Sequence, residues 1–566
     1  MCRLVPLQTL LIAKYSDLLG GDSRSATNYF VQVCRCAGLI PINTFATVNN
    51  LLSLDQGALA VHESLEKAML SDSIRNKLRR ERKRREGEPP SIVFSRSGAQ
   101  LNLKLLLAVP RPDKPYRPTT VGACALHAND FIESPETEQL RHGLLPVITE
   151  FAASWEAQNP REIGPLLRRS YYIYHRLQNH AGIRSLVAAE LSSVVEDVRF
   201  AGLPFSSYFP LLFGFYTAAR DAVVRQATSI VDGVDIANKA HVSHEDFTTF
   251  ILSKARTLDE ARVDFGQIDT VQDFRRRVED SAWTSDMLPF RKKPLLILPD
   301  GHHLVVDMTC LIENASAGIF WTFMEQLTSA NARHRFSAYY GNVFESYAQE
   351  LVKHYFPSMA QNLSFGAGDI DIFLDDGSIA MPIEVKSGFI PQRVKGARDQ
   401  LMLGAELEKK YVVDQDGSPK GVRQLAAAVR ALREQRVAGI AKKYVRIYPV
   451  LVAEDPIMQT VGMNAYLNQL FEREVNRGTD VAPLTILQID EIEQVLPHLK
   501  AGDLSFREVL DTRFVGESVV AQPMHTTFSE IARERNLKVR EDTFLKSHGD
   551  ELIEMITSAY APLLKK

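Results

Sequence analysis

Residues 368–388, GDIDIFLDDGSIAMPIEVKSG, constrain the fold more than any other segment of this chain. Polar and apolar residues alternate over 368–374, which is the period-two pattern of a half-buried β-strand. The run Asp375-Asp376-Gly377 is a strong turn signal, and an apolar run returns over 381–386. The sequence therefore predicts a β-hairpin with its turn at this run.

The predicted hairpin brings ionisable side chains together. Asp369 and Asp371 face one side of the first strand. Glu384 and Lys386 share a face of the second strand, while Val385 points toward the core. A hairpin of this length places Asp371 next to Glu384, so that two carboxylates and one ammonium converge. Burying such groups costs free energy unless a cation or a substrate compensates them.

A divalent metal ion would supply this compensation. Carboxylate oxygens suit Mg²⁺, which keeps several waters and accepts phosphate oxygens as further ligands. The main-chain carbonyl of Val385 would complete the ligand set. Lys386 would lie beside a metal-bound water, help to lower its pKa and orient it for in-line attack on phosphorus. We therefore expect phosphodiester hydrolysis without a covalent intermediate, with Mg²⁺ as the cofactor and Mn²⁺ as a substitute.

The pattern of Asp371, twelve intervening residues and then Glu384-Val385-Lys386 resembles the PD-(D/E)XK (restriction-endonuclease-like) nuclease superfamily. The resemblance covers residues 335–455. No Pro precedes Asp371 here, at a position that the superfamily keeps only loosely. The resemblance implies that Asp371 and Glu384 bind Mg²⁺ and that Lys386 assists the nucleophilic water.

The same resemblance indicates further site residues. The run 341–345, GNVFE, resembles the helical element that precedes the hairpin in the family, which makes Glu345 a fourth member. Family members often place a Gln on a helix after the Lys, and Gln400 and Gln424 are the two candidates. Gln424 is favoured because an Ala-rich, tightly packing helix surrounds it. Asp369 is either a second ligand or only an acid at the start of the strand.

The order of predicted elements indicates an α/β nuclease core, a mixed central sheet flanked by helices. A large, mainly α-helical N-terminal region precedes this core, and a C-terminal α+β extension follows it. With 566 residues the chain is too long for one core. The expected units are a mixed N-terminal region over 1–130, a helical domain over 131–288, the PD-(D/E)XK-like nuclease domain over 289–456, and a mostly helical C-terminal extension over 457–566.

Particular runs carry these expectations. A helix over 337–357 shows an apolar stripe, while KPLLIL and HHLVVD (293–307) flank a turn and predict a hairpin. Segment 91–110 also predicts a hairpin around Ser97-Gly98. The apolar run at 444–453 is a buried-strand candidate, and the run at 483–489 is strand-like.

Composition excludes several classes of protein. The chain is 45% hydrophobic and 24% charged, which is ordinary for a globular protein rather than a disordered one. Its five cysteines are scattered and odd in number, which argues against a disulfide framework and fits a reducing cytosol. No stretch approaches the length of apolar residues that a membrane span requires. We expect a cytoplasmic protein with no membrane partner.

A basic segment over 75–85 leaves two interpretations open. Its cations are Arg75, Lys77, Arg79, Arg80, Arg82, Lys83, Arg84 and Arg85. Such a run suits contact with a phosphate backbone, and it equally suits a solvated helix end. The same two interpretations hold for Arg393, Lys395 and Arg398. The formal net charge of -3 neither favours nor excludes nucleic acid as a partner.

The leading functional hypothesis is a Mg²⁺-dependent DNA endonuclease of bacterial anti-phage defence. The helical regions would bind a protein partner or a second copy of the chain. This biological role rests on an analogy of layout with nuclease effectors. The alternatives are a repair or recombination nuclease, an RNase, and a catalytically silent module that binds nucleic acid or serves assembly.

Overall fold

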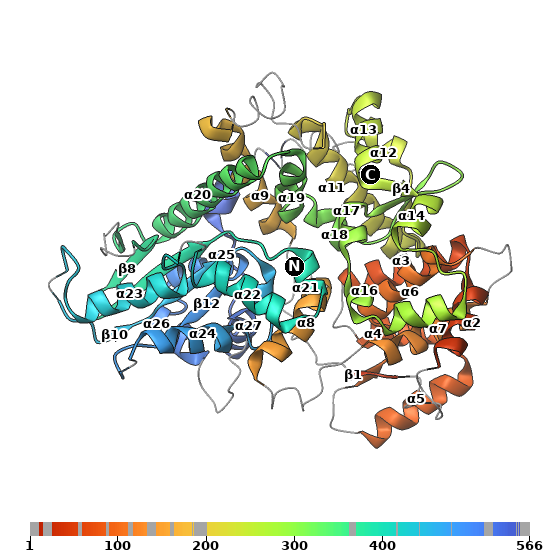
Figure 1. The fold of residues 1–566 in the computed structure, drawn as a ribbon, viewed down its shortest axis with the longest axis horizontal. Coiled ribbons are helices and arrows are strands. Elements are labelled where there is room, and N and C mark those ends of the chain that lie inside the picture. The colour runs from red at the N-terminus through yellow and green to blue at the C-terminus, as the bar shows by residue number, and fades with distance from the viewer. Residues whose placement is uncertain are drawn as a thin grey trace.

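The computed structural model describes residues 11–14, 18, 25–54, 59–85, 90–110, 117–132, 143–158, 163–183, 185, 201–361, 369–414, 417–440, 442–476, 478–513, 524–550, 552 and 554. Helices dominate this part of the chain and surround small sheets, so the fold is of a mixed α/β type (Figure 1). The mainly helical character expected of the N-terminal half is confirmed.

Helices with a shared apolar core build the N-terminal part. They are α2 (Ala26–Cys36), α3 (Leu39–Leu54), α4 (Leu59–Met69), α5 (Asp72–Arg84), α6 (Arg96–Ala108) and α7 (Pro118–Phe131). Two short strands, β1 (Leu11–Ile12) and β2 (Ser91–Ile92), pair in parallel beside them.

The hairpin expected over 91–110 is wrong, because most of this segment is the helix α6. The helix begins after Ser95, whose hydroxyl accepts a 3.0 Å hydrogen bond from the backbone N–H of Gly98. Every residue of α6 except Ser97 is buried. A continuous apolar run suits a fully buried helix as well as a strand, so periodicity alone does not separate the two.

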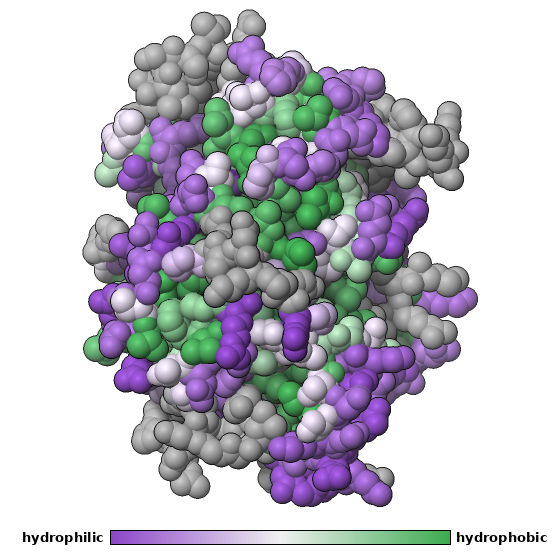
Figure 2. All heavy atoms as spheres, turned by 90° about the vertical axis from the view of Figure 1, so that its right-hand side faces the viewer, coloured by the Kyte–Doolittle hydropathy of each residue, from purple (hydrophilic) through white to green (hydrophobic). Residues whose placement is uncertain are grey.

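The basic segment lies on α5, in which the one buried residue is Leu78. Arg82 donates to Glu66 at 2.8 Å, and Arg85 donates to Glu81 at the same distance. Figure 2 shows hydrophilic side chains gathered at the lower end of this face of the molecule, where α5 lies. Part of the basic charge is thus paired within the protein, and the rest faces solvent.

A four-stranded sheet lies in the middle of the chain, in the order β3-β6-β5-β4. Its strands are β3 (Ile230–Val231), β4 (Ala255–Thr257), β5 (Leu295–Ile297) and β6 (His303–Val305). β5 and β6 are antiparallel, which confirms the hairpin expected from KPLLIL and HHLVVD. The helices of this region are α8 (Leu144–Gln158), α9 (Ile163–Asn179), α11 (Phe205–Gln226), α12 (Gly233–Lys239), α13 (His244–Lys254), α14 (Leu258–Asp264), α15 (Val271–Glu279), α16 (Ser281–Ser285), α17 (Leu288–Lys292), α18 (Met308–Glu313) and α19 (Ala317–Gln326).

A six-stranded mixed sheet follows, in the order β12-β11-β9-β8-β7, with β10 also paired to β9. The strands are β7 (Ala360–Gln361), β8 (Ile372–Asp376), β9 (Ile379–Lys386), β10 (Arg446–Ile447), β11 (Val450–Ala453) and β12 (Thr485–Gln488). β7, β8 and β9 are antiparallel, whereas β9, β11 and β12 are parallel. The strands expected within 444–453 and 483–489 are therefore confirmed.

Helices cover both faces of this sheet. The helices of this part of the chain are α20 (Ala330–Tyr355), α21 (Gln392–Gly396), α22 (Gln400–Tyr411), α23 (Val422–Arg433), the 3-10 helix η2 (Pro456–Gln459), α24 (Met463–Glu474), α25 (Ile489–Ala501), α26 (Phe506–Thr512) and α27 (Met524–Glu534). Ile372 and Val385 pack in one apolar cluster with residues of α20 and α25. Phe373 and Ala380 pack in another with residues of α22, α23 and α24. The two faces follow from the period-two alternation of the strands.

The long helix α20 presents the predicted apolar stripe to the core. Its buried residues include Tyr340, Val343, Phe344, Tyr347, Leu351 and Tyr355. Figure 1 shows α20 lying along one side of the sheet, with α22 and α23 on the other side. The apolar stripe therefore determines which face of α20 packs against the sheet and which side chains of the helix lie beside the stripe.

The sheets do not follow the domain boundaries expected at 288 and 456. β5 and β6, placed after 288, join the sheet formed with β3 and β4. β12, placed after 456, pairs with β11. One apolar cluster also links α2, α3, α6 and α7 to β5 and β6. The four expected units stay a prediction. Strands from neighbouring units pair with each other across the expected boundaries at 288 and 456.

Within the described residues, no single helix combines the length and apolarity of a bilayer-crossing segment. α2 and α3 satisfy these two criteria only jointly, as a pair bent by 107°.

Candidate active site

The hairpin of β8 and β9 sets the register of the candidate site. Ile372 pairs with Ile383 across the two antiparallel strands. Asp371 is one residue before β8, and this register continued by one residue places it opposite Glu384, where the sequence predicts it. Gly377 makes the turn with a φ of 66°, a left-handed conformation that glycine adopts without a steric cost.

A direct hydrogen bond fastens Asp371 to the second strand. The backbone N–H of Val385 donates to Asp371 Oδ2 at 2.6 Å. Val385 itself packs into the apolar cluster beside α20. Strand alternation then places its neighbours Glu384 and Lys386 on the other face. The structure thus joins the two strands at the point where their charged residues lie.

Glu384 and Lys386 form an ion pair on this face of β9. The Glu384 side chain is 0% exposed, and that of Lys386 is 19% exposed. Oε1 of Glu384 accepts from the Lys386 ammonium. Oε2 is buried and has no hydrogen-bond partner among the described residues. A buried carboxylate oxygen in this state carries a free energy cost that a cation or a proton would remove.

Helix α20 adds Glu345 to the same group. Oε1 of Glu345 accepts a 3.0 Å hydrogen bond from the side-chain amide of Gln349, one helical turn later. The same amide donates to the main-chain carbonyl of Asp371 at 3.0 Å. Gln349 therefore bridges the helix and the start of β8, which holds Glu345 close to Asp371.

The electrostatics of the group favour bound positive charge. Burial raises the pKa of Glu384 to about 8, although Lys386 opposes this effect. Burial also raises the pKa of Glu345 to about 7, and the charge of Asp371 adds to the rise. The pKa of Asp371 is likewise raised by burial. Burial alone would lower the pKa of Lys386, but Glu384 and Asp371 outweigh it and raise that pKa. One ammonium thus faces three carboxyl groups.

The metal-ligand set expected from the sequence is only partly formed. No group of three or more His, Cys, Asp or Glu side chains has the geometry to hold one ion within the described residues. Asp371 is occupied by the Val385 N–H and Glu384 by Lys386. The donor chemistry nevertheless fits Mg²⁺, since the side chains are carboxylates and Glu384 Oε2 is buried without a hydrogen-bond partner among the described residues.

The predicted Asp369 and the two candidate glutamines have different surroundings. Asp369 is exposed at the edge of the described segment. Gln400 is exposed at the first residue of α22. Gln424 accepts a 2.6 Å hydrogen bond from the Gly421 N–H, so it caps its own helix α23. No hydrogen bond in the described part of the chain links either Gln to Asp371, Glu384 or Lys386.

The cations that follow the motif have different surroundings. Lys395 is buried and pairs with Asp455 at 2.7 Å, so it holds the loop after β9 rather than facing solvent. The backbone N–H of Ile390 donates to the same carboxylate at 2.6 Å. Arg393 is exposed on α21. Of these two cations, Arg393 has the exposure that contact with a ligand requires.

The sequence prediction did not include Gln349. Its position four residues after Glu345 places it on the same helix face, which is a signal available in the sequence. Its link to Asp371 depends on how α20 packs against the hairpin and has no local signature.

Comparison with protein-family models, with curated proteins and with solved structures gave no significant match for this chain.

Proposed function

We propose that this chain is a Mg²⁺-dependent nuclease that hydrolyses phosphodiester bonds of DNA. The observation that carries the proposal is the hydrogen bond from the Val385 N–H to Asp371 Oδ2, beside the ion pair of Glu384 and Lys386 on the same strand β9. Glu345 joins them from α20 through Gln349. A group of three carboxyls and one ammonium in a partly buried site is costly to maintain for stability alone.

Asp371 and Glu384 are the residues proposed to hold the metal ion, with Glu345 beside them. When bound, Mg²⁺ would neutralise the carboxylates and polarise the phosphate ester. Glu384 would offer Oε2, which has no hydrogen-bond partner among the described residues, while Oε1 accepts from Lys386. Mn²⁺, which also accepts oxygen ligands, is expected to replace Mg²⁺.

The chain's own groups then serve the hydrolysis. A water oxygen forms a bond to phosphorus, and the ester bond to the leaving oxygen breaks. The Lys386 ammonium has three N–H donors, so beside its contact with Glu384 it can donate to the incoming water or to a phosphate oxygen and hold it in place. The water loses a proton, for which Glu345 is the proposed acceptor because Gln349 holds its carboxylate close to Asp371. The leaving oxygen takes up a proton from solvent.

The substrate and the biological setting extend this proposal. DNA is proposed as the substrate, in an anti-phage defence system in which the helical regions bind a protein partner or a second copy. This part rests on the layout of helical regions before and after the mixed sheet. RNA or branched DNA as the preferred substrate would keep the catalytic proposal and change its setting.

The test compares wild-type protein with Asp371→Ala on plasmid, linear, flap and single-stranded DNA and on tRNA. Each reaction is run with Mg²⁺, with Mn²⁺ and with EDTA. We expect the wild-type protein to cleave in a metal-dependent way. Asp371→Ala should lower the cleavage rate by more than about 100-fold, because losing a metal ligand costs more than losing an outer-shell partner. The matched control is Asp376→Ala, because Asp376 is exposed at the turn of the same hairpin.

The control variant should retain wild-type activity, and circular dichroism should show that both variants keep the fold. If none of the substrates were cleaved with either metal ion, the proposed nuclease function would be wrong. Equal activity of Asp371→Ala and wild type would remove the assigned site.

A further inference from the structure

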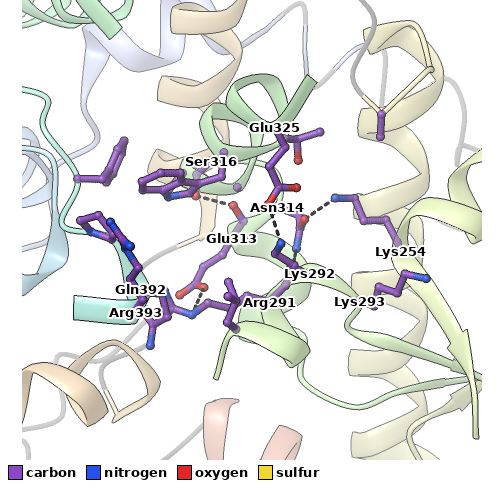
Figure 3. A pocket seen from close by; sticks show the side chains of 18 of the residues that line it. Lys254, Arg291, Lys292, Lys293, Glu313, Asn314, Ser316, Glu325, Gln392 and Arg393 are labelled. Atoms are coloured by element: carbon purple, nitrogen blue, oxygen red, sulfur yellow. Dashed lines mark hydrogen bonds and ion pairs between the residues drawn. The ribbon is translucent and has the colours of Figure 1, made fainter. Parts of the chain in front are cut away.

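A cavity lies apart from the candidate active site. It encloses about 620 Å³, within the range of small-molecule sites. Its walls come from α13, α17, α18 and α19 and from the segment that follows β9 (Figure 3). Glu345, Asp371, Glu384 and Lys386 are not among the lining residues. The cavity is therefore a separate feature, although its wall at Phe389 begins only three residues after Lys386.

Positive charge predominates in the lining. The cationic residues are Lys254, Arg291, Lys292, Lys293, Arg393 and Lys395, and the acidic ones are Glu313 and Glu325. Such an excess inside a concave site attracts anions, because low-dielectric walls focus the field of the charges.

Some of these cations are already compensated. Arg291 lies 3.6 Å from Glu313, and Lys292 lies 2.7 Å from Glu325. Lys395 is paired with Asp455 outside the lining. Lys254, Lys293 and Arg393 form no ion pair with a carboxylate in the part of the chain that the structure describes. These three leave the cavity with charge that a bound anion would balance.

Lys254 is the strongest indication of a ligand. It is only 4% exposed, yet its ammonium donates to a neutral group, Asn314 Oδ1, at 2.7 Å. Burial lowers the pKa of Lys254 to about 8, and the charge of Glu325 opposes this effect only in part. A buried ammonium beside a cavity without a carboxylate partner is costly in the unliganded protein. An anionic ligand would remove that cost.

Groups suited to the rest of a ligand lie around the cavity. Figure 3 shows Gln392 and Arg393 on the opposite side of the cavity from Lys254. Trp321 is half-buried and lines the cavity together with Phe389, at a ring-centroid distance of 6.4 Å. Aromatic faces of this kind stack on nucleobases with little dependence on the base.

We propose that this cavity binds a nucleotide, with its phosphates between Lys254 and Arg393 and its base against Trp321. The site is a binding site for a small molecule and is separate from the proposed nuclease centre. Its test reads binding alone, so it stands or fails independently of DNA cleavage.

The experiment is calorimetric titration of the full-length protein in EDTA with ATP, ADP, adenosine and inorganic tripolyphosphate. EDTA keeps metal-dependent binding at the other site out of the measurement. We expect ATP to bind more tightly than adenosine, which lacks the phosphates. ATP should also bind more tightly than tripolyphosphate, which lacks the base.

Variants then assign the binding to this cavity. Lys254→Met and Arg393→Gln should each weaken ATP binding by about 10-fold or more, as expected for lost hydrogen bonds to a charged group. Trp321→Leu should weaken ATP binding and leave tripolyphosphate unchanged. Lys77→Met, at an exposed lysine of α5, is the control and should bind as wild type does. Arg393 is exposed, so Arg393→Gln tests the proposal even if Lys254→Met does not fold.

Several results would overturn the proposal. One is the absence of ATP binding at ATP concentrations up to about 1 mM. Another is an equal affinity for ATP of wild type, Lys254→Met and Arg393→Gln. Tripolyphosphate binding as tightly as ATP would reduce the cavity to a general anion site. If the protein bound a single-stranded oligonucleotide but no mononucleotide, the cavity would belong to a nucleic-acid-binding surface instead.

Discussion

The side-chain amide of Gln349 donates a 3.0 Å hydrogen bond to the main-chain carbonyl of Asp371. Its second hydrogen reaches Glu345 Oε1, also at 3.0 Å. One amide thus ties Glu345 of α20 to Asp371, the residue directly before β8. Since Gln349 lies between two residues of the proposed centre without being one of them, it is a positioning residue.

Gln349→Leu should lower the rate of metal-dependent cleavage by about 10-fold to 100-fold, the cost typical of losing an outer-shell partner. The leucine keeps the bulk of the side chain and removes both hydrogen bonds. We expect the concentration of Mg²⁺ needed for half-maximal activity to rise as well. A purely structural role would lower stability without changing this metal dependence.

The control for this prediction is Ser346→Ala on the exposed side of the same helix. Among the residues that the structure describes, its hydroxyl bonds only to the Asn342 carbonyl, within α20. An unchanged Mg²⁺ dependence in Gln349→Leu would show that the bridge does not position the carboxylates.

Gly122→Ala should destabilise the protein by about 1–3 kcal/mol, as overpacking of a tight contact does. A Cβ at Gly122 in α7 would lie 2.2 Å from the carbonyl oxygen of Met69, at the end of α4. Backbone cannot move away as a flexible side chain can, so the two helices would have to separate. Denaturant unfolding measures the change.

Gly164→Ala in α9 is the matched control, because a Cβ there meets nothing within 4 Å. Alanine favours the helix over glycine, so this variant should be as stable as wild type or slightly more stable. Equal unfolding free energies for the two variants would contradict the close packing of α4 and α7.

Local patterns predicted the parts of the site that lie within one element. The alternation of polar and apolar residues around Asp371 and Glu384 predicted the hairpin. The apolar stripe of α20 predicted which face of the helix packs on the sheet and therefore where Glu345 lies. Local patterns failed where two structures share a signature, as in the Leu-rich run 91–110. Local patterns also did not decide between Gln400 and Gln424, because the position of a residue on a helix does not show whether its side chain reaches a distant strand.

The long-range assembly had no signal in a single sequence. The pairing of β3 and β4 with the hairpin of β5 and β6 joins segments separated by tens of residues. These strands have only two or three residues each, too few for a periodic pattern. Their partners are selected by the packing of the surrounding helices.

Arg169→Met should destabilise the protein by about 3–5 kcal/mol, the cost of breaking a buried ion pair from one side. Arg169 lies 2.6 Å from Glu493 and 2.5 Å from Asp490, and its side chain is 2% exposed. Its removal leaves the buried carboxylate of Glu493 and the partly buried one of Asp490 without the cation that both of them contact. The double variant Arg169→Met/Glu493→Gln should lose at least about 1 kcal/mol less than the sum of the single variants.

Arg507→Met gives the comparison at the surface. Arg507 pairs with Asp511 at 3.4 Å, but its side chain is 71% exposed, so the change should stay within about 0.5 kcal/mol. Additive effects of Arg169→Met and Glu493→Gln would mean that the two residues do not interact in solution.

Lys104 should make the stability of the protein rise with pH above neutrality. It is buried in α6, donates to the carbonyls of Trp283 and Asp286, and lies 4.3 Å from the centroid of the Trp283 ring. Burial lowers its pKa to about 7, although the charges of Asp286 and Asp280 oppose the effect. The unfolded chain keeps the ordinary lysine pKa near about 10.4.

Between these two values the unfolded state therefore binds more protons at Lys104 than the folded state does. Stability then increases as pH rises through this window, and the increase from pH 7 to pH 9 is about 2 kcal/mol. Lys104→Met removes the group, so the difference in unfolding free energy between wild type and variant should change by that amount. Urea unfolding at the two pH values measures it, with Lys77→Met as the exposed control. If wild type and Lys104→Met give parallel pH profiles, the buried ammonium keeps an ordinary pKa and the burial argument for Lys104 is wrong.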